Sequence, residues 1–191
     1  MTSTPPNLVH PLSGKVDVFV GGAGTGGTVS GVARGIKKAH NPVVLSLVWT
    51  LFVNLVTPVD FCLHALPQVG SMLALPASLN EASKGCSYAI EGIGYDFAPD
   101  VLTRDPGMID TWVKTNDTDA FAAVQLLMRH ETMLVGGSSG SSLAGALAWL
   151  RSESGREISQ TPGMNVVVML PDGCVSSVVS LRQVVTRCTQ P

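Results

Sequence analysis

Charge and aromatic side chains are scarce in this chain. Only 14% of the residues are charged and 5% are aromatic, and the twelve lysines and arginines never form a basic run. With a net charge of −2, the chain has no electrostatic footprint for nucleic acid, which argues against that function class. In 191 residues, a 45% share of apolar residues is enough for one domain with a real core.

Cysteine is also scarce, and it follows no metal or disulfide pattern. There is no C-x-x-C spacing and no companion histidine pair for the four cysteines Cys62, Cys86, Cys174 and Cys188. We therefore expect no metal site and reduced thiols in a cytoplasmic protein. Residues 1–14 have no apolar core of a signal peptide and too little arginine for a transit peptide.

One long apolar segment, residues 43–68, stands out. Asp60 is its only formally charged residue, and the segment has no clear period. Pro58 limits the uncharged run after Pro42 to fifteen residues, short of the roughly twenty that a membrane-spanning helix needs. The sequence therefore favours a buried strand over residues 43–49, followed by an apolar loop or helix, and argues against a membrane span.

A glycine-rich loop follows the first predicted strand, Val16 to Val20. Five of the seven residues from Gly21 to Gly27 are glycine, and a predicted helix opens on Thr28 and ends near Asn41-Pro42. Backbone N–H groups in such a loop can point at a phosphate on the positive end of the helix. The pattern therefore predicts an anion-binding cradle.

The remaining chain alternates strand and helix patterns. Asn116 begins a well-signalled amphipathic helix, and a second Gly/Ser turn over residues 136–142 precedes another helix. Strands are predicted at residues 109–113, 133–135 and 165–170. This alternation predicts an α/β fold, a mainly parallel sheet with flanking helices.

Two familiar glycine motifs are present, but each lacks a further residue that its function requires. The dinucleotide-binding motif G-x-G-x-x-G fits Gly22, Gly24 and Gly27, but it also needs an acidic residue about twenty positions on, and none follows until Asp60. The phosphate-binding loop of nucleoside triphosphatases needs a lysine after the glycines, and none is present there. Gly136, Ser138 and Gly140 fit G-x-S-x-G, but all four histidines lie upstream, which excludes an α/β-hydrolase triad. Two Gly/Ser/Thr turns at strand ends suit a small phosphorylated cofactor instead.

Four stretches resemble one enzyme family, in the same order along the chain. They are GKVDVFVGGAGTGGTVSGVARGIKK, EGIGYDFAPDVLTRD, NDTDAF and LVGGSSGSSLAGAL. The chain thereby resembles the cystathionine β-synthase and cysteine synthase family of fold type II pyridoxal-phosphate enzymes. The resemblance implies an incomplete large domain. Residues 1–191 would form a single partial catalytic domain that corresponds to the C-terminal part of the family's catalytic core. Residues 43–68 would be an atypical hydrophobic insert in it.

The resemblance also implies a pyridoxal 5'-phosphate site. Ser138 would hydrogen-bond the pyridine nitrogen, although Ser138 could instead cap a helix, and Ser139 could fill either role. Glu91, Gly92 and Tyr95 would line the substrate side, whereas the spacing of Gly92 and Gly94 is equally typical of a tight turn. The cofactor phosphate would be held by Gly24, Thr25, Gly26, Gly27 and Thr28.

The family reaction is β-replacement in sulfur amino-acid metabolism. An amino acid such as serine loses its leaving group, and a thiol such as homocysteine adds; a hydroxyl at the ring nitrogen suits this chemistry better than transamination. The resemblance implies amino-acid and thiol substrates and a homodimer of the full-length protein.

This chain departs from the family in two places. The family's Schiff-base lysine lies far upstream of the glycine loop in a Ser-x-Lys setting, and no lysine here has that setting, so we expect no catalytic residue and no turnover by this chain alone. A non-catalytic fragment that binds a phosphate ligand or a partner remains the alternative. We further hypothesise that residues 43–68 derive from a retained intron or mispredicted exon.

Overall fold

The protein contains a four-stranded parallel sheet. The computed structural model describes residues 16–38, 45–51, 73, 77–81, 88–95, 97–105 and 108–174, with the backbone alone at residues 36–38, 45–51 and 79. The strands lie in the order β3-β2-β1-β4, and every neighbouring pair is parallel. Their bounds are β1 Val18–Gly22, β2 Leu45–Leu51, β3 Thr111–Thr115 and β4 Val166–Val168. The predicted α/β class with a mainly parallel sheet is confirmed.

Strand β2 comes from the apolar segment and lies inside the sheet. It pairs with β1 on one side and with β3 on the other, with Val48 opposite both Gly21 and Trp112. A strand with two parallel neighbours is ordinarily covered on both faces, so its sequence need not alternate. The strand prediction is therefore confirmed for residues 45–49, and β2 continues two residues beyond the predicted end. Residues 43, 44 and 52–68 lie outside the described part of the chain.

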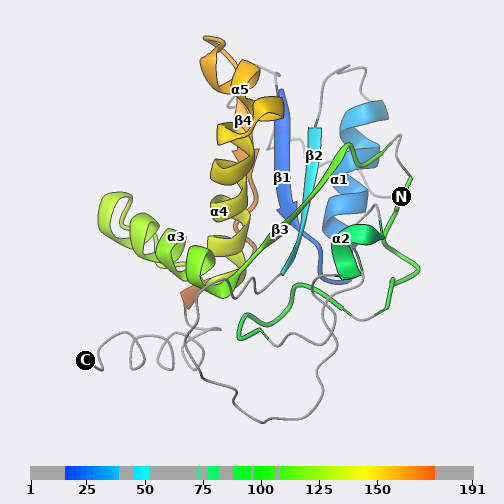
Figure 1. Ribbon diagram of the computed structural model, residues 1–191, viewed down its shortest axis with the longest axis horizontal. Coiled ribbons are helices and arrows are strands. Elements are labelled where there is room, and N and C mark those ends of the chain that lie inside the picture. The colour runs from blue at the N-terminus through cyan, green and yellow to red at the C-terminus, as the bar shows by residue number, and fades with distance from the viewer. Residues whose placement is uncertain are drawn as a thin grey trace.

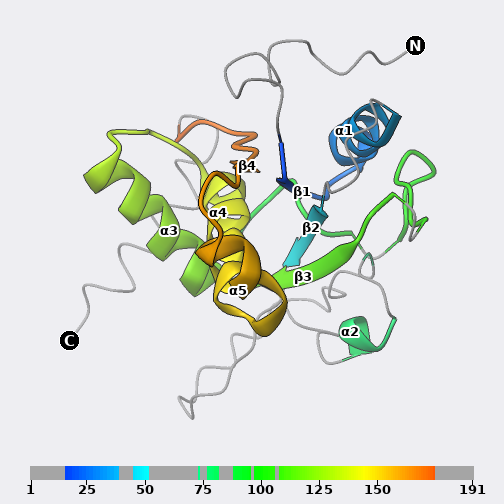
Figure 2. The same ribbon diagram turned by 90° about the horizontal axis from the view of Figure 1, so that it is seen from above.

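Helices cover both faces of this sheet, as Figures 1 and 2 show. On one side lie α1 (Gly27–Lys38) and the short α2 (Ser78–Glu81); on the other lie α3 (Asp117–His130), α4 (Gly137–Arg151) and α5 (Glu153–Gln160). The side chains of β1 contact the two helical layers in turn, because successive side chains of a strand point to opposite faces of the sheet. Val18 and Val20 pack against Ala146 and Trp149 of α4, and Phe19 packs against Val32 of α1.

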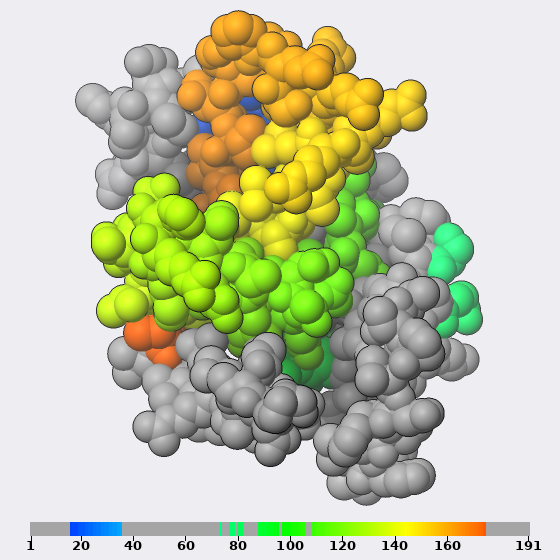
Figure 3. All heavy atoms as spheres, turned by 60° about the vertical axis from the view of Figure 1, so that its left-hand side comes forward, coloured from blue at the N-terminus to red at the C-terminus, as the bar shows by residue number. Residues whose placement is uncertain are grey.

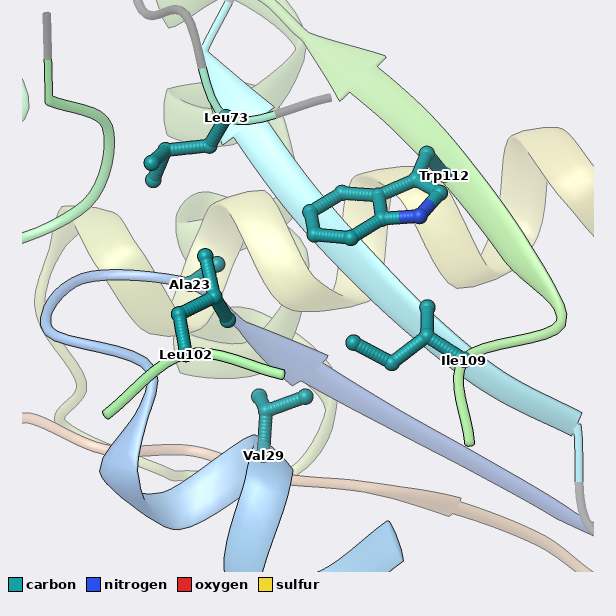
Figure 4. Packing of buried hydrophobic residues seen from close by; sticks show 6 residues of the cluster. All are labelled: Ala23, Val29, Leu73, Leu102, Ile109 and Trp112. Atoms are coloured by element: carbon teal, nitrogen blue, oxygen red, sulfur yellow. The ribbon is translucent and has the colours of Figure 1, made fainter. Parts of the chain in front are cut away.

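A hydrophobic cluster joins the glycine-rich loop to β3 (Figure 4). Val29 of α1 and Trp112 of β3 belong to it, together with residues from the segments that connect the elements. The full set is Ala23, Val29, Leu73, Leu102, Ile109 and Trp112, all of them at most 9% exposed. The loop that follows β1 is thus packed against the hydrophobic core through Ala23.

Helices α3 and α4 show one correct and one wrong prediction. Asn116 caps α3 as predicted, because its side-chain oxygen accepts from the Asp119 amide at 2.8 Å. The predicted turn over residues 136–142 is wrong: α4 already begins at Gly137, so these residues form its N-cap and first turns. Figure 3 shows α3 as a continuous band across the outer face, next to α4.

All five predicted strands differ from the structure, and the one predicted for residues 16–20 is β1, Val18–Gly22. The strand predicted for residues 133–135 is wrong, since Val135 makes only one antiparallel bridge, to Gly173. The predicted strands at 109–113 and 165–170 are β3 and the shorter β4. Within the described residues, no helix is both long and apolar enough to cross a bilayer, and no three acidic, cysteine or histidine side chains gather as a metal site would need.

Candidate functional site

The glycine-rich loop forms the turn between β1 and α1. Gly26 has a φ of +82°, which L side chains rarely adopt, and its carbonyl accepts the first helical bond from the Ser30 amide at 2.9 Å. Amides in the first turn of a helix have no partner inside the helix. Together with the exposed side chains of Thr25 and Thr28, these amides are suited to an anion at the positive helix end.

The segment 88–95 lies directly against this loop. The Gly94 amide donates to the Ala23 carbonyl at 3.0 Å. A Cβ atom added to Gly24 would collide with the carbonyl oxygen of Gly92. Two of the predicted site residues, Gly24 and Gly92, are therefore in backbone contact, and only glycine at position 24 permits that approach.

The same segment is anchored on the start of α3. The Ala89 amide donates to Oδ2 of Asp117 at 2.7 Å, and Ile90 and Ile93 pack among buried side chains of α3. Burial of the Asp117 carboxyl raises its pKa above the ordinary 3.8, and the backbone hydrogen bonds from Ala89 and Ile90 oppose this shift. Asp117 thus holds the predicted substrate segment to a helix, a role that its place in the first turn of α3 did not reveal.

Segment 88–95 also touches the beginning of α4, which carries Ser138. A Cβ atom on Gly137 would lie 3.0 Å from the Ile90 side chain, and one on Gly22 would lie 3.0 Å from Ile93 and 3.8 Å from the Ser142 hydroxyl. The glycine-rich loop and the first turns of α4 therefore meet around one segment, at the carboxyl end of β1. Ligands of open α/β sheets bind at this edge.

The remaining predicted site residues of segment 88–95, Glu91 and Tyr95, differ in their exposure to solvent. Glu91 is exposed. Tyr95 is half-buried, packs against the cluster of Figure 4, and its ring centroid lies 5.2 Å from that of Phe97. Tyr95 is therefore tied to the hydrophobic cluster next to the glycine-rich loop.

Four serines at the start of α4 have different partners. The Ser139 hydroxyl donates a hydrogen bond to Asp172, and the Ser141 hydroxyl accepts one from the Thr115 hydroxyl at 3.2 Å. The Ser142 hydroxyl donates to the Ser138 carbonyl at 3.2 Å. Ser138 is 5% exposed, and its hydroxyl makes no hydrogen bond to any other residue that the structure describes. Neither Ser138 nor Ser139 is the N-cap, which is Gly136. Of the two serines that the sequence left open, Ser138 is the one whose hydroxyl makes no hydrogen bond within the described part of the chain.

Asp172 is the site residue that sequence reasoning missed. Its carboxylate oxygen Oδ1 accepts from the amide of Ser139 at 2.9 Å and from the Ser139 hydroxyl at 2.5 Å. Asp172 belongs to the Leu-Pro-Asp stretch at residues 170–172, just after β4, and nothing local in that stretch indicates a contact 33 positions away.

The fold is that of an α/β protein whose sheet edge is suited to a small phosphorylated cofactor. The family described as "Pyridoxal-phosphate dependent enzyme" matches residues 1–172. Cystathionine beta-synthase of Dictyostelium discoideum is 40% identical over 170 residues, and that of Mus musculus is 37% identical over 169; the matches cover 88% of this chain, but only 28% and 25% of those proteins.

Two further relatives agree. Cysteine synthase A of Salmonella typhi is 34% identical over 169 residues, which is 88% of this chain and 45% of that protein. The solved structure of a hydrogen sulfide-producing enzyme from Fusobacterium nucleatum superposes with a TM-score of 0.63 and 26% identity, and covers 87% of this chain and 46% of that one. The chain belongs to the pyridoxal-phosphate-dependent enzymes, in the cystathionine β-synthase and cysteine synthase family, and spans a quarter to less than half of these relatives' length. The cofactor of this family is pyridoxal phosphate.

Proposed function

We propose that this chain is the cofactor-binding part of a pyridoxal-phosphate-dependent β-replacement lyase. Its reaction would be that of the relatives' names: serine plus homocysteine to cystathionine, or cysteine synthesis. The observation that carries the proposal is the backbone contact between Gly24 and Gly92, beside a helix N-terminus and next to α4. This contact joins the predicted phosphate side to the predicted substrate side.

On this proposal each side chain has a distinct task. Amides of residues 24–28 bind the phosphate dianion, and the hydroxyls of Thr25 and Thr28 add donors at the exposed rim. The Ser138 hydroxyl donates to the ring nitrogen and orients the ring. Glu91, Gly92 and Tyr95 face the amino acid. When bound, the cofactor supplies an electron sink for loss of the β-substituent.

The substrates, compartment and assembly of the proposed enzyme are taken from its family. Amino acids and thiols are its proposed substrates, the cytoplasm its compartment, and a homodimer its assembled form. Cys174, the one cysteine in the described part of the chain, is not in a disulfide, which is compatible with a reducing compartment.

Binding of pyridoxal phosphate and of phosphate-free pyridoxal to the purified protein tests the proposal. A phosphate held by several charge-assisted hydrogen bonds, each of about 1.5–3 kcal/mol, makes pyridoxal phosphate bind at least about tenfold more tightly. Equilibrium dialysis measures both dissociation constants. Equal affinity for the two compounds would refute a phosphate cradle.

A matched pair of glycine substitutions locates the cradle. Gly24→Ala drives a methyl group into the Gly92 carbonyl, so the loop must move and the preference for the phosphorylated compound should fall about tenfold. Gly31→Ala is the control, because a Cβ atom there meets nothing within 4 Å. If both variants bind alike, the phosphate lies elsewhere.

A further inference from the structure

Helix α4 begins without a capping side chain of its own. Its N-cap is Gly136, which makes no side-chain cap hydrogen bond, and Gly137 follows. An N-cap side chain ordinarily accepts from the amide of the second or third residue of the helix. In α4 the third residue is Ser139, and its amide donates to Oδ1 of Asp172 at 2.9 Å. Asp172 thus performs the capping from outside the helix, where a negative charge is also favoured by the helix dipole.

Asp172 makes further contacts to the same turn. Its Oδ1 accepts from the Ser139 hydroxyl at 2.5 Å, and its carbonyl oxygen lies 3.0 Å from that hydroxyl. The Gly136 amide donates to the Asp172 carbonyl at 3.2 Å. The start of α4 is therefore held at both Gly136 and Ser139, the two residues on either side of the Gly137-Ser138 pair.

Asp172 is itself held in place by its neighbours in the chain. Gly173 bridges to Val135, and the Cys174 amide donates to the Leu134 carbonyl at 3.1 Å. Residues 172–174 consequently run alongside residues 134–136, so the carboxylate approaches α4 from a supported backbone.

We propose that Asp172 is a positioning residue for Ser138. By engaging both polar groups of Ser139, it sets the rotation of the first turn of α4 and leaves Ser138 as the serine that meets the ring nitrogen of the cofactor. This inference rests on the proposed function, and it adds a residue that acts through the protein rather than on the cofactor.

A cofactor analogue with CH in place of the ring nitrogen isolates this effect. The ratio of its dissociation constant to that of pyridoxal phosphate reports the Ser138 bond, and we expect about fivefold in the unsubstituted protein. Ser138→Ala should lower the ratio to about one, and Asp172→Ala should lower it below about twofold. Asp172→Asn, which keeps an oxygen acceptor for Ser139, should restore most of it. The exposed Asp100→Ala is the control with an unchanged ratio.

The phosphate preference, measured against phosphate-free pyridoxal, separates the possible failures. If the unsubstituted protein shows no phosphate preference, the proposed function fails. If that preference is intact but Asp172→Ala keeps the fivefold ring-nitrogen ratio, this inference alone is overturned. If the unsubstituted protein has a ratio of one, this inference and the ring-nitrogen role proposed for Ser138 are both overturned, and the phosphate cradle is not. Should Asp172→Ala not fold, Ser139→Ala decides: a ratio at least halved supports the inference, and an unchanged ratio overturns it.

Discussion

Asp117 is a residue whose protonation the fold alters. Burial raises the pKa of its carboxyl above 3.8, so the folded chain binds this proton more readily than the unfolded chain does. The contribution of Asp117 to the free energy of unfolding is therefore fully present below pH 3.8 and is lost as the pH rises through the raised pKa.

Asp117→Asn removes this titration and keeps an oxygen that can accept from Ala89. As the pH falls from neutral to about 4, we expect the unsubstituted protein to gain stability relative to the variant. Urea denaturation of both proteins across this range measures the difference, with Asp119→Asn as the control because Asp119 is an exposed carboxylate in the same turn of α3. A relative loss of stability at the lower pH would contradict the assigned direction.

Single residues were predictable from the sequence where their partners are close in the chain. The Asn116 cap, for example, reaches Asp119, three positions on. The contacts of Asp117 with Ala89 and of Asp172 with Ser139 span 28 and 33 positions. Such pairs are set by how the elements pack, which local patterns do not encode.

At the scale of elements, the crossing of α3 and α4 depends on one glycine. A Cβ atom at Gly140 would collide with the Ala120 carbonyl and with the Val124 side chain. Alanine has a helix propensity about 1 kcal/mol better than glycine, whereas overpacking of a core costs about 1–3 kcal/mol and more where backbone must shift. We expect Gly140→Ala to lower the free energy of unfolding by about 2 kcal/mol, as measured by urea denaturation.

Gly31→Ala again supplies the comparison, because the same substitution in α1 meets open space. It should leave stability unchanged or raise it by up to about 1 kcal/mol. A Gly140→Ala variant as stable as Gly31→Ala would mean that the two helices separate at no cost, contrary to the close packing proposed here.

The start of α4 shows why its extent could not be predicted from the sequence. Seven consecutive Gly and Ser residues have poor helix propensity and are typical of a turn. The Asp172 cap and the close approach at Gly140 come from tertiary contacts, and tertiary context overrides propensity. The strong local signals of α3, in contrast, gave its start correctly.

For the whole molecule, the least expected feature is the use of the apolar segment. Residues 45–51 pair with β1 and β3, so this part of residues 43–68 belongs to the sheet. Its composition left strand, loop and membrane interpretations open, because an unbroken apolar run has the same appearance in each. The hypothesis of a retained intron concerns the gene and stays a prediction, which transcript sequencing across codons 42–69 tests.

The expectation that this chain does not turn over alone also belongs to the scale of the whole molecule. The chain has five lysines, and none lies in the family's Ser-x-Lys setting: Lys15, Lys37, Lys38, Lys84 and Lys114. Lys114 is half-buried on β3 and has an interaction partner. A lysine that bonds the cofactor must be neutral and directed at it, so we expect pyridoxal phosphate to bind this chain reversibly.

Borohydride reduction followed by intact-mass measurement checks this expectation, because reduction makes a lysine–cofactor bond permanent. The protein should retain bound cofactor before reduction and carry less than one adduct per chain afterwards. Inorganic phosphate in excess is the control, since it competes for the cradle and not for surface lysines. One adduct per chain that phosphate suppresses, mapped to a single lysine, would show that this chain supplies its own nucleophile and would make it a candidate enzyme without a partner.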